Sequence, residues 1–253
     1  MVDTALVTGG TGGIGSAIVQ RLAAGGSNVA VHFRNNENAV DLLLEQVRGL
    51  GRKGIAVQAD FNFQDVDGLS RMVINTVTEQ LGAPNTVVLT ASAQDVTPWE
   101  DLNAETWDHV YANTIRMTAA MIQAAAANML NHDHANKCII VLGSIEGIRP
   151  AANHAPYATM KAATHHLVTA AAHELGRHGI RVVGIAPGLV DRHGLREDWP
   201  QGVESFEKTA ALGRTVTARE IAETVAWLSS PAASAITGVT IPVDAGWSSH
   251  PGW

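Results

Sequence analysis

The sequence has a single cysteine, no long apolar run and a small number of basic residues. Cys138 is the only cysteine in 253 residues, which excludes an internal disulfide, and its place in the apolar run 138–142 predicts a small buried hydrophobic side chain. This composition suits a reducing compartment. No apolar run approaches the roughly 18 residues needed to span a bilayer, and the N-terminus begins as a strand instead of a signal peptide. We therefore expect a cytoplasmic protein that does not bind membranes.

The charge balance argues against nucleic acid as a partner. The chain carries 17 basic and 24 acidic side chains, for a net charge of −7. Such a balance provides no basic surface for a phosphate backbone. A small-molecule partner fits better. The 46% hydrophobic content of the chain is enough for a large core, so we expect residues 1–253 to form one domain.

Apolar runs alternate with amphipathic segments along most of the chain, which predicts repeated strand–helix units. We expect strands at residues 4–7, 28–33, 55–59, 86–89, 138–142, 181–185 and 239–243, and helices at 16–24, 37–50, 66–81, 106–130, 156–177 and 218–228. Near-continuous apolar strands indicate a sheet that is buried on both faces. The predicted fold is a single-domain, Rossmann-type, doubly wound parallel α/β sheet of about seven strands with helices on both faces.

Two C-terminal segments are less regular. Residues 189–214 contain Gly, Pro and charged residues without a clean period, and we expect a mobile substrate loop with short helical pieces there. Trp199 is a candidate lid residue within this loop. Trp227 recurs with Ile221 and Leu228 in the last predicted helix, and we expect it to belong to the core.

A glycine-rich turn follows the first predicted strand. It reads Thr8-Gly-Gly-Thr-Gly-Gly-Ile-Gly15 and leads directly into a predicted helix. Glycines in such a turn let the backbone approach a pyrophosphate, while the helix N-terminus offers unpaired N–H groups and the positive end of the helix dipole. A merely flexible turn is the alternative, but the strand–turn–helix context favours a dinucleotide site.

The residue after the second strand bears on the choice of cofactor. An NAD site usually places a carboxylate there, whereas the 2′-phosphate of NADP needs a cation. Arg34 follows this strand, and no Asp or Glu occurs before Glu37. A guanidinium group can hold a phosphate with two parallel donors. We therefore favour NADP(H), with NAD(H) possible, although Arg34 on a solvated turn remains an alternative.

Three polar side chains are expected to meet after the fifth strand. Ser144 ends the apolar run 138–142, and Tyr157 and Lys161 are four residues apart on the predicted helix that follows. Residues at this spacing share one face of a helix. The pattern predicts an active site in which the ammonium of Lys161 lowers the pKa of the Tyr157 phenol and so favours proton exchange.

Together, the glycine turn, Ser144 and the Tyr157-x-x-x-Lys161 pair resemble the classical short-chain dehydrogenase/reductase family, and are most similar to its 3-oxoacyl-[acyl-carrier-protein] reductases. The resemblance covers essentially the whole chain. Further matches are Asp60, Asn113, Pro187-Gly188, Thr237-Gly238 and the segment 243–246.

The resemblance implies a catalytic tetrad and a cofactor site. The tetrad would be Asn113, Ser144, Tyr157 and Lys161, with Tyr157 as the acid, Ser144 as hydrogen-bond donor to the carbonyl, and Asn113 holding a water that connects Lys161 to solvent. The cofactor would contact Gly9, Thr11, Gly13, Ile14, Gly15, Arg34, Asp60, Phe61, Ala91, Tyr157, Lys161, Pro187, Gly188 and Val190. The family is commonly tetrameric, so we expect a homotetramer.

The chain also departs from the family pattern. Thr90-Ala91-Ser92-Ala93 stands where the family has Asn-Asn-Ala-Gly, and Gly12 stands where many NADP-dependent members carry a basic residue. Four residues near the tetrad or in the loop are candidates for substrate contact: Gln94, Glu146, His154 and Trp199. Paired histidines such as His165-His166 lack a converging third ligand, so we predict no metal.

The predicted function is NADP(H)-dependent reduction of a ketone on a small or carrier-bound substrate, with Tyr157 as general acid. Two alternatives stay open at this point. One is an NAD-dependent alcohol dehydrogenase that works in the oxidative direction. The other is a dinucleotide-binding regulatory protein without turnover, which the altered segment 90–93 motivates.

Overall fold

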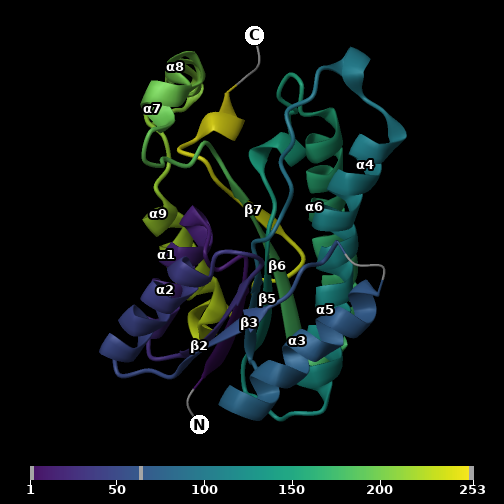
Figure 1. The fold of residues 1–253 in the computed structure, drawn as a ribbon, viewed down its shortest axis with the longest axis vertical. Helices are drawn as coiled ribbons and strands as arrows, with labels where there is room; N and C mark the ends of the chain where they lie inside the picture. Colours follow the sequence, from purple (N-terminus) through teal and green to yellow (C-terminus); the bar gives the residue numbers. More distant parts are fainter. Residues whose placement is uncertain (1–2, 63–64, 251–253) are drawn as a thin grey trace.

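A computed structural model describes residues 3–62 and 65–250 of the chain. Its strands form a seven-stranded parallel sheet in the order β3-β2-β1-β4-β5-β6-β7 (Figure 1). They are β1 (Thr4–Thr8), β2 (Asn28–Phe33), β3 (Gly54–Gln58), β4 (Thr86–Leu89), β5 (Lys137–Leu142), β6 (Ile180–Pro187) and β7 (Thr240–Val243). The doubly wound, single-domain α/β fold expected from the sequence is confirmed.

Helices cover both faces of this sheet. The α-helices are α1 (Gly13–Ala24), α2 (Glu37–Gly49), α3 (Val66–Leu81), α4 (Ala104–Tyr111), α5 (Met117–Leu130), α6 (Ala155–Leu175), α7 (Leu195–Asp198), α8 (Pro200–Thr209) and α9 (Ala218–Ser229). Helices α1, α2 and α9 pack together on one face, while α3, α5 and α6 cover the other (Figure 1). Because both faces are covered, the central strands are buried along almost their whole length and are mostly apolar.

Short irregular helices complete the chain path. The 3-10 segments are Trp99–Asp101, Ile145–Gly147, Gly176–His178, Pro231–Ala233 and Trp247–Ser249. A π-helical segment, Ala112–Arg116, joins α4 to α5, so the long helix expected at 106–130 contains one wider turn. The segment 189–214 holds α7 and α8, which agrees with the short helical pieces expected there; its mobility stays a prediction.

The expectation for Trp227 is wrong. Its side chain is 45% exposed, whereas Ile221 and Leu228 are fully buried. The buried face of α9 is set by Ile221, Val225 and Leu228, which are spaced by four and three residues. Trp227 lies about 100° away from that face. By contrast, Cys138 is fully buried, as its apolar surroundings predict.

The strand order indicates the edge of the sheet at which a ligand is expected to bind. The chain runs outward from β1 to β2 and β3, and then crosses back to β4 beside β1. In an open parallel sheet, ligands bind beyond the carboxyl ends of the strands at such a reversal. The loops after β1, β2, β4, β5 and β6 all leave from this edge. Among the described residues, no helix is both long and apolar enough to cross a membrane.

Candidate active site

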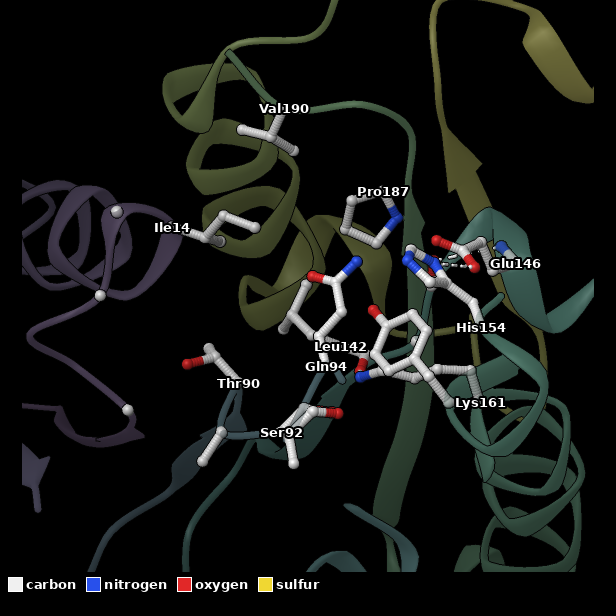
Figure 2. Close-up of a pocket in the computed structure, with 18 of the residues that line it drawn as sticks. Ile14, Thr90, Ser92, Gln94, Leu142, Glu146, His154, Lys161, Pro187 and Val190 are labelled. Atoms are coloured by element: carbon white, nitrogen blue, oxygen red, sulfur yellow. Dashed lines mark hydrogen bonds and ion pairs between the residues drawn. The ribbon is translucent and has the colours of Figure 1, made fainter. Parts of the chain in front are cut away.

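One cleft of about 1600 Å³ lies at the carboxyl edge of the sheet (Figure 2). Every residue that the sequence singled out as catalytic, cofactor-binding or substrate-contacting lines this cleft. From the tetrad and the substrate candidates these are Asn113, Ser144, Tyr157, Lys161, Gln94, Glu146, His154 and Trp199; from the cofactor set they are Gly9, Thr11, Gly13, Ile14, Gly15, Arg34, Asp60, Phe61, Ala91, Pro187, Gly188 and Val190.

The glycine turn forms one end of the cleft and has the shape that a pyrophosphate requires. Gly9 adopts a left-handed conformation with φ of 60°, and a Cβ on Gly15 would collide with the carbonyl oxygen of Gly9. In contrast, a Cβ on Gly13 would meet nothing within 4 Å. Helix α1 begins there, and its N-cap, Gly12, has no side chain to cap it. The N–H groups at this terminus are therefore available to an anion, which fits a dinucleotide.

His32 holds the glycine turn in place, although no sequence motif points to this residue. The ring is 3% exposed, and its Nδ1 accepts the Gly9 N–H at 3.1 Å. Its Nε2 lies 3.1 Å from the carbonyl oxygen of Ala59, so Nε2 carries the proton and donates it to that oxygen. Burial lowers the pKa of His32 to about 4 and keeps the ring neutral. The neutral ring thereby links the ends of β1, β2 and β3.

Arg34 lies at the part of the cleft beside the end of β2. This residue follows β2 directly, its side chain is exposed to the cleft, and it makes no ion pair with any other described residue. The neighbouring Asn36 is occupied as the N-cap of α2, where its Oδ1 accepts the Ala39 N–H at 3.2 Å. Arg34 is thus the basic group that could hold a 2′-phosphate here.

The segment 90–93 after β4 is held by hydrogen bonds to β1 and to the π-helical segment. The Thr90 N–H donates to Thr8 Oγ1 at 3.0 Å, and the Thr90 hydroxyl donates to the Thr8 carbonyl oxygen. Ser92 Oγ lies 3.1 Å from Thr114 Oγ1, in the π-helical segment. These hydroxyl groups connect β4 to β1 and to the α4–α5 region without the amide side chains that the family has at these positions.

Ser144, Tyr157 and Lys161 converge at the other end of the cleft. Ser144 follows β5 and is 8% exposed, and Tyr157 and Lys161 lie one turn apart on α6, at 8% and 3% exposure. Lys161 Nζ donates to the carbonyl oxygen of Leu142 at 2.8 Å and lies 5.5 Å from the centre of the Tyr157 ring. The expected convergence of these three side chains is therefore what the structure contains.

Asn113 lies within the same cleft but is bonded elsewhere. It sits in the π-helical segment, and its Nδ2 donates to Asn62 Oδ1 and, at 2.9 Å, to the His109 carbonyl oxygen. Among the described residues, its side chain makes no bond to Ser144, Tyr157 or Lys161. Its implied role through a bound water stays a prediction.

The effect of Lys161 on Tyr157 differs from the expectation. Burial raises the pKa of Tyr157 to about 12, and the Glu146 charge adds to this rise, whereas a hydrogen bond with Ser144 acts in the opposite direction. Burial also lowers the pKa of Lys161 to about 8, partly opposed by Glu146. The predicted lowering of the phenol pKa by Lys161 is wrong for this arrangement, because loss of hydration disfavours both charged forms.

A half-buried histidine also supports Ser144. His165 lies one turn beyond Lys161 on α6, and its Nε2 accepts the Ser144 N–H at 3.4 Å. Its ring occupies a slot between Gly143 and Gly147; a Cβ on Gly147 would lie 2.7 Å from the ring. Burial and the nearby Lys161 charge lower the pKa of His165 and keep it an acceptor. Its spacing from Lys161 was the only sequence signal for this contact.

The part of the cleft beside Tyr157 carries an acid–imidazole pair. His154 Nδ1 lies 2.8 Å from Glu146 Oε2, and the ring of His154 stands edge-on to that of Tyr157 at 6.1 Å between centres. Figure 2 shows Glu146 and His154 near Lys161, with Ile14 and Val190 toward the other side of the cleft. Trp199 lies at the N-terminus of α8 and is 51% exposed.

Comparison with known proteins places this geometry among related folds. A family model described as enoyl-(acyl carrier protein) reductase matches residues 9–248. The 3-oxoacyl-[acyl-carrier-protein] reductase FabG of Staphylococcus aureus is 32% identical, with 97% of this chain and 98% of that protein covered. A short-chain dehydrogenase/reductase from Serratia marcescens superposes with a TM-score of 0.89 at 30% identity, covering 97% and 98% of the two chains.

A second similar structure contains a cofactor. It is a blue fluorescent protein from a metagenomic library, in complex with NADPH, with a TM-score of 0.87 and 28% identity over 97% of both this chain and that one. The likeness in each of these comparisons extends over nearly the whole chain, so the glycine turn and the Ser144–Lys161 region fall within the matched part.

The contacts of His32 predict a pH-dependent stability. Between pH values of about 6.5 and 4, His32 is protonated in the unfolded chain but not in the folded chain. The free energy of unfolding therefore falls as the pH falls. From pH 7 to pH 5 this one group should contribute a loss of about 2 kcal/mol. Urea unfolding at both pH values should show a smaller loss for His32→Asn than for the parent. The exposed His166→Asn should behave like the parent, and an equal loss in all three proteins would contradict the assignment.

Proposed function

The chain belongs to the short-chain dehydrogenase/reductase family, whose members are oxidoreductases of CH–OH and C=O groups, and from this premise we propose that it reduces a ketone to a secondary alcohol with NADPH. The observation that carries the proposal is the convergence of Ser144, Tyr157 and Lys161 in the cleft that also holds the uncapped N-terminus of α1. A carbonyl group placed beside Tyr157 would thus lie within reach of a cofactor held by the glycine turn.

The roles of the residues follow from their chemistry. NADPH, when bound, supplies the hydride that the carbonyl carbon accepts. The oxygen of that carbonyl becomes negative as the C–H bond forms, and Tyr157 donates its phenolic proton to this oxygen while the Ser144 hydroxyl donates a hydrogen bond. The products are then a secondary alcohol and a phenolate, and the phenolate must regain a proton before the next turnover.

The electrostatics of the pair support this direction. A phenol whose pKa is raised to about 12 is protonated at neutral pH and is ready to act as an acid. A lysine whose pKa is lowered to about 8 exchanges its proton near neutral pH and is suited to resupply that acid. Lys161 also fixes the local backbone through its bond to the Leu142 carbonyl oxygen. A cation next to a developing phenolate stabilises the charge that the reaction creates.

Arg34 is the basis for proposing NADPH. It is a free guanidinium group among the described residues, at the point where NAD-selective folds usually place a carboxylate. The structure of the similar metagenomic protein holds NADPH. The competing proposal, an NAD-dependent alcohol dehydrogenase, is favoured by Gly12, since the glycine turn supplies no basic side chain as a second phosphate partner.

The segment 189–214 is proposed to act as a lid over the substrate. Helices α7 and α8 border the cleft, and two ion pairs brace them, Arg192–Asp198 at 2.8 Å and Arg196–Glu207 at 2.6 Å. Trp199 sits between these two helices and lines the cleft. An exposed aromatic ring at this place can cover an apolar part of a substrate.

The first prediction concerns Tyr157. Tyr157→Phe keeps the ring and removes the proton donor, so kcat for ketone reduction should fall by about 10² to 10⁴-fold while NADPH binding is retained. The absorbance change of NADPH gives the rate, and cofactor fluorescence gives the binding. Tyr111→Phe is the matched control, because Tyr111 is the other of the two tyrosines in the chain and is 45% exposed. A Tyr157→Phe protein as active as the parent would refute the mechanism.

The second prediction concerns cofactor choice. Arg34→Glu should weaken NADPH binding relative to NADH by about 10 to 100-fold, because a charge-assisted hydrogen bond contributes about 1.5–3 kcal/mol. Dissociation constants for both cofactors should be measured by fluorescence titration. Arg48→Glu on α2 is a control of equal charge change, since Arg48 is exposed and lies outside the cleft. A parent protein that already prefers NADH would favour the dehydrogenase alternative.

The third prediction concerns assembly, which we propose to be tetrameric through α6. The exposed face of α6 consists mainly of small residues, including Ala162, Ala163 and Ala170, and such a face lets a second helix approach closely. Sedimentation equilibrium should give four times the mass of the chain, and Ala163→Arg should lower that mass. A monomeric parent would contradict the proposal.

A further inference from the structure

The pair formed by Glu146 and His154 is built into the reacting end of the cleft. His154 Nδ1 and Glu146 Oε2 are 2.8 Å apart, and only 13% and 16% of the two side chains are exposed. A carboxylate oxygen only accepts hydrogen bonds, so Nδ1 carries the proton of this bond. The orientation of the imidazole ring and its tautomer are therefore fixed by Glu146, as in other acid–imidazole pairs.

The backbone adds a second constraint on the ring. His154 occupies the N-cap position of α6 but makes no capping bond, so its side chain is turned toward Glu146. The preceding residue, Asn153, has a left-handed conformation with φ of 63°, which asparagine tolerates better than most residues. The Asn153 carbonyl oxygen accepts the Thr97 N–H at 2.8 Å, which ties the loop after β5 to the loop after β4.

The second ring nitrogen is left available to a ligand. Within the described part of the chain, Nε2 of His154 has no hydrogen-bond partner, and the residue lines the cleft. The edge-on contact with Tyr157, at 6.1 Å between ring centres, puts the imidazole within the span of one small molecule from the proton donor. A substrate whose carbonyl oxygen meets Tyr157 would therefore bring its neighbouring atoms to Nε2.

The charged side chains at this end of the cleft limit which chemical group a substrate can carry next to its reacting carbonyl. Glu146 acts on both Tyr157 and Lys161, so the Lys161 ammonium beside Tyr157 is already faced by a carboxylate. Arg149 also lines the cleft, but its side chain is exposed to solvent, and Arg192 is paired with Asp198. A carboxylate attached directly to the reacting carbonyl would face the half-buried Glu146 charge, and the exposed Arg149 is only a solvent-screened partner, so binding of that carboxylate is disfavoured.

We propose that His154, oriented by Glu146, is a specificity-determining residue that hydrogen-bonds a second, uncharged oxygen adjacent to the reacting carbonyl. The substrate class is thus a ketone with a vicinal hydroxyl or carbonyl group, and 2-oxo acids are excluded from it. The inference rests on the proposed ketone reduction and adds the identity of the group next to the reacting carbon.

Four-carbon ketones of matched size test this inference. NADPH-dependent reduction of 2-butanone, 3-hydroxy-2-butanone, 2,3-butanedione and 2-oxobutanoate should be measured for the parent protein. We expect kcat/KM for the hydroxyketone and the diketone to exceed that for 2-butanone by about tenfold, the contribution of one good hydrogen bond. The value for 2-oxobutanoate should lie below that for 2-butanone.

Substitutions at His154 and Glu146 test whether this pair causes the preference for the hydroxyketone and the diketone. His154→Phe should bring the ratio of kcat/KM for the hydroxyketone to that for 2-butanone down to about one, and His154→Gln, which keeps a hydrogen-bonding group, should retain part of the parent's ratio. Glu146→Gln should raise kcat/KM for 2-oxobutanoate, because the repelling charge is gone. The control is His178→Phe, which should match the parent. His178 is exposed and lies in the 3-10 segment that follows α6.

Calorimetric titration provides a readout that needs no turnover. With NADP⁺ present, 2,3-butanedione, which carries no alcohol that NADP⁺ could oxidise, should bind the parent more tightly than 2-butanone, and His154→Phe should abolish the difference. A parent that reduces these ketones without preference, or a preference that survives in His154→Phe, overturns the inference and leaves the proposed function standing. A parent that reduces none of the four but shows the binding difference overturns the function and upholds the site, and the absence of both effects overturns the two together.

Discussion

The buried ammonium group of Lys161 is the contact on which the geometry of this site depends. A charge that is 3% exposed is costly unless it is partnered, and here its partner is the carbonyl oxygen of Leu142 at the end of β5. This bond joins α6 to the sheet at the point where the chain continues into Ser144. Because Tyr157 lies one turn before Lys161 on the same face, one buried contact sets the position of both the strand end and the proton donor.

Histidines perform much of the remaining positioning. His32 connects the glycine turn to the end of β3. The ring of His165 lies between two glycines and accepts the Ser144 N–H, and the ring of His154 is oriented by Glu146. For the first two, burial lowers the pKa, so the neutral imidazole can both donate and accept hydrogen bonds inside the protein. The hydroxyls of Thr90 and Ser92 have a comparable function after β4, where they replace amide side chains and still link neighbouring elements.

The titration behaviour of the site shows why a motif does not by itself fix a pKa. From the spacing of Tyr157 and Lys161 one expects the cation to lower the pKa of the phenol. In the folded protein both groups are buried, and loss of hydration raises one pKa and lowers the other. The pair is thereby set up as a protonated acid beside a readily exchanging base, which suits carbonyl reduction and depends on the depth of the cleft.

The sequence by itself determined the order of strands and helices, the glycine turn, and the serine, tyrosine and lysine that meet at one place. These features are local: periodicity reports which face of an element is buried, and a spacing of four residues reports a shared helix face. Only the tertiary structure decided the partners of His32, His165 and Glu146, the exposure of Trp227 and the direction of the Tyr157 pKa. Such properties arise where elements distant in the chain pack together, because burial and hydrogen bonding there depend on what the fold brings alongside.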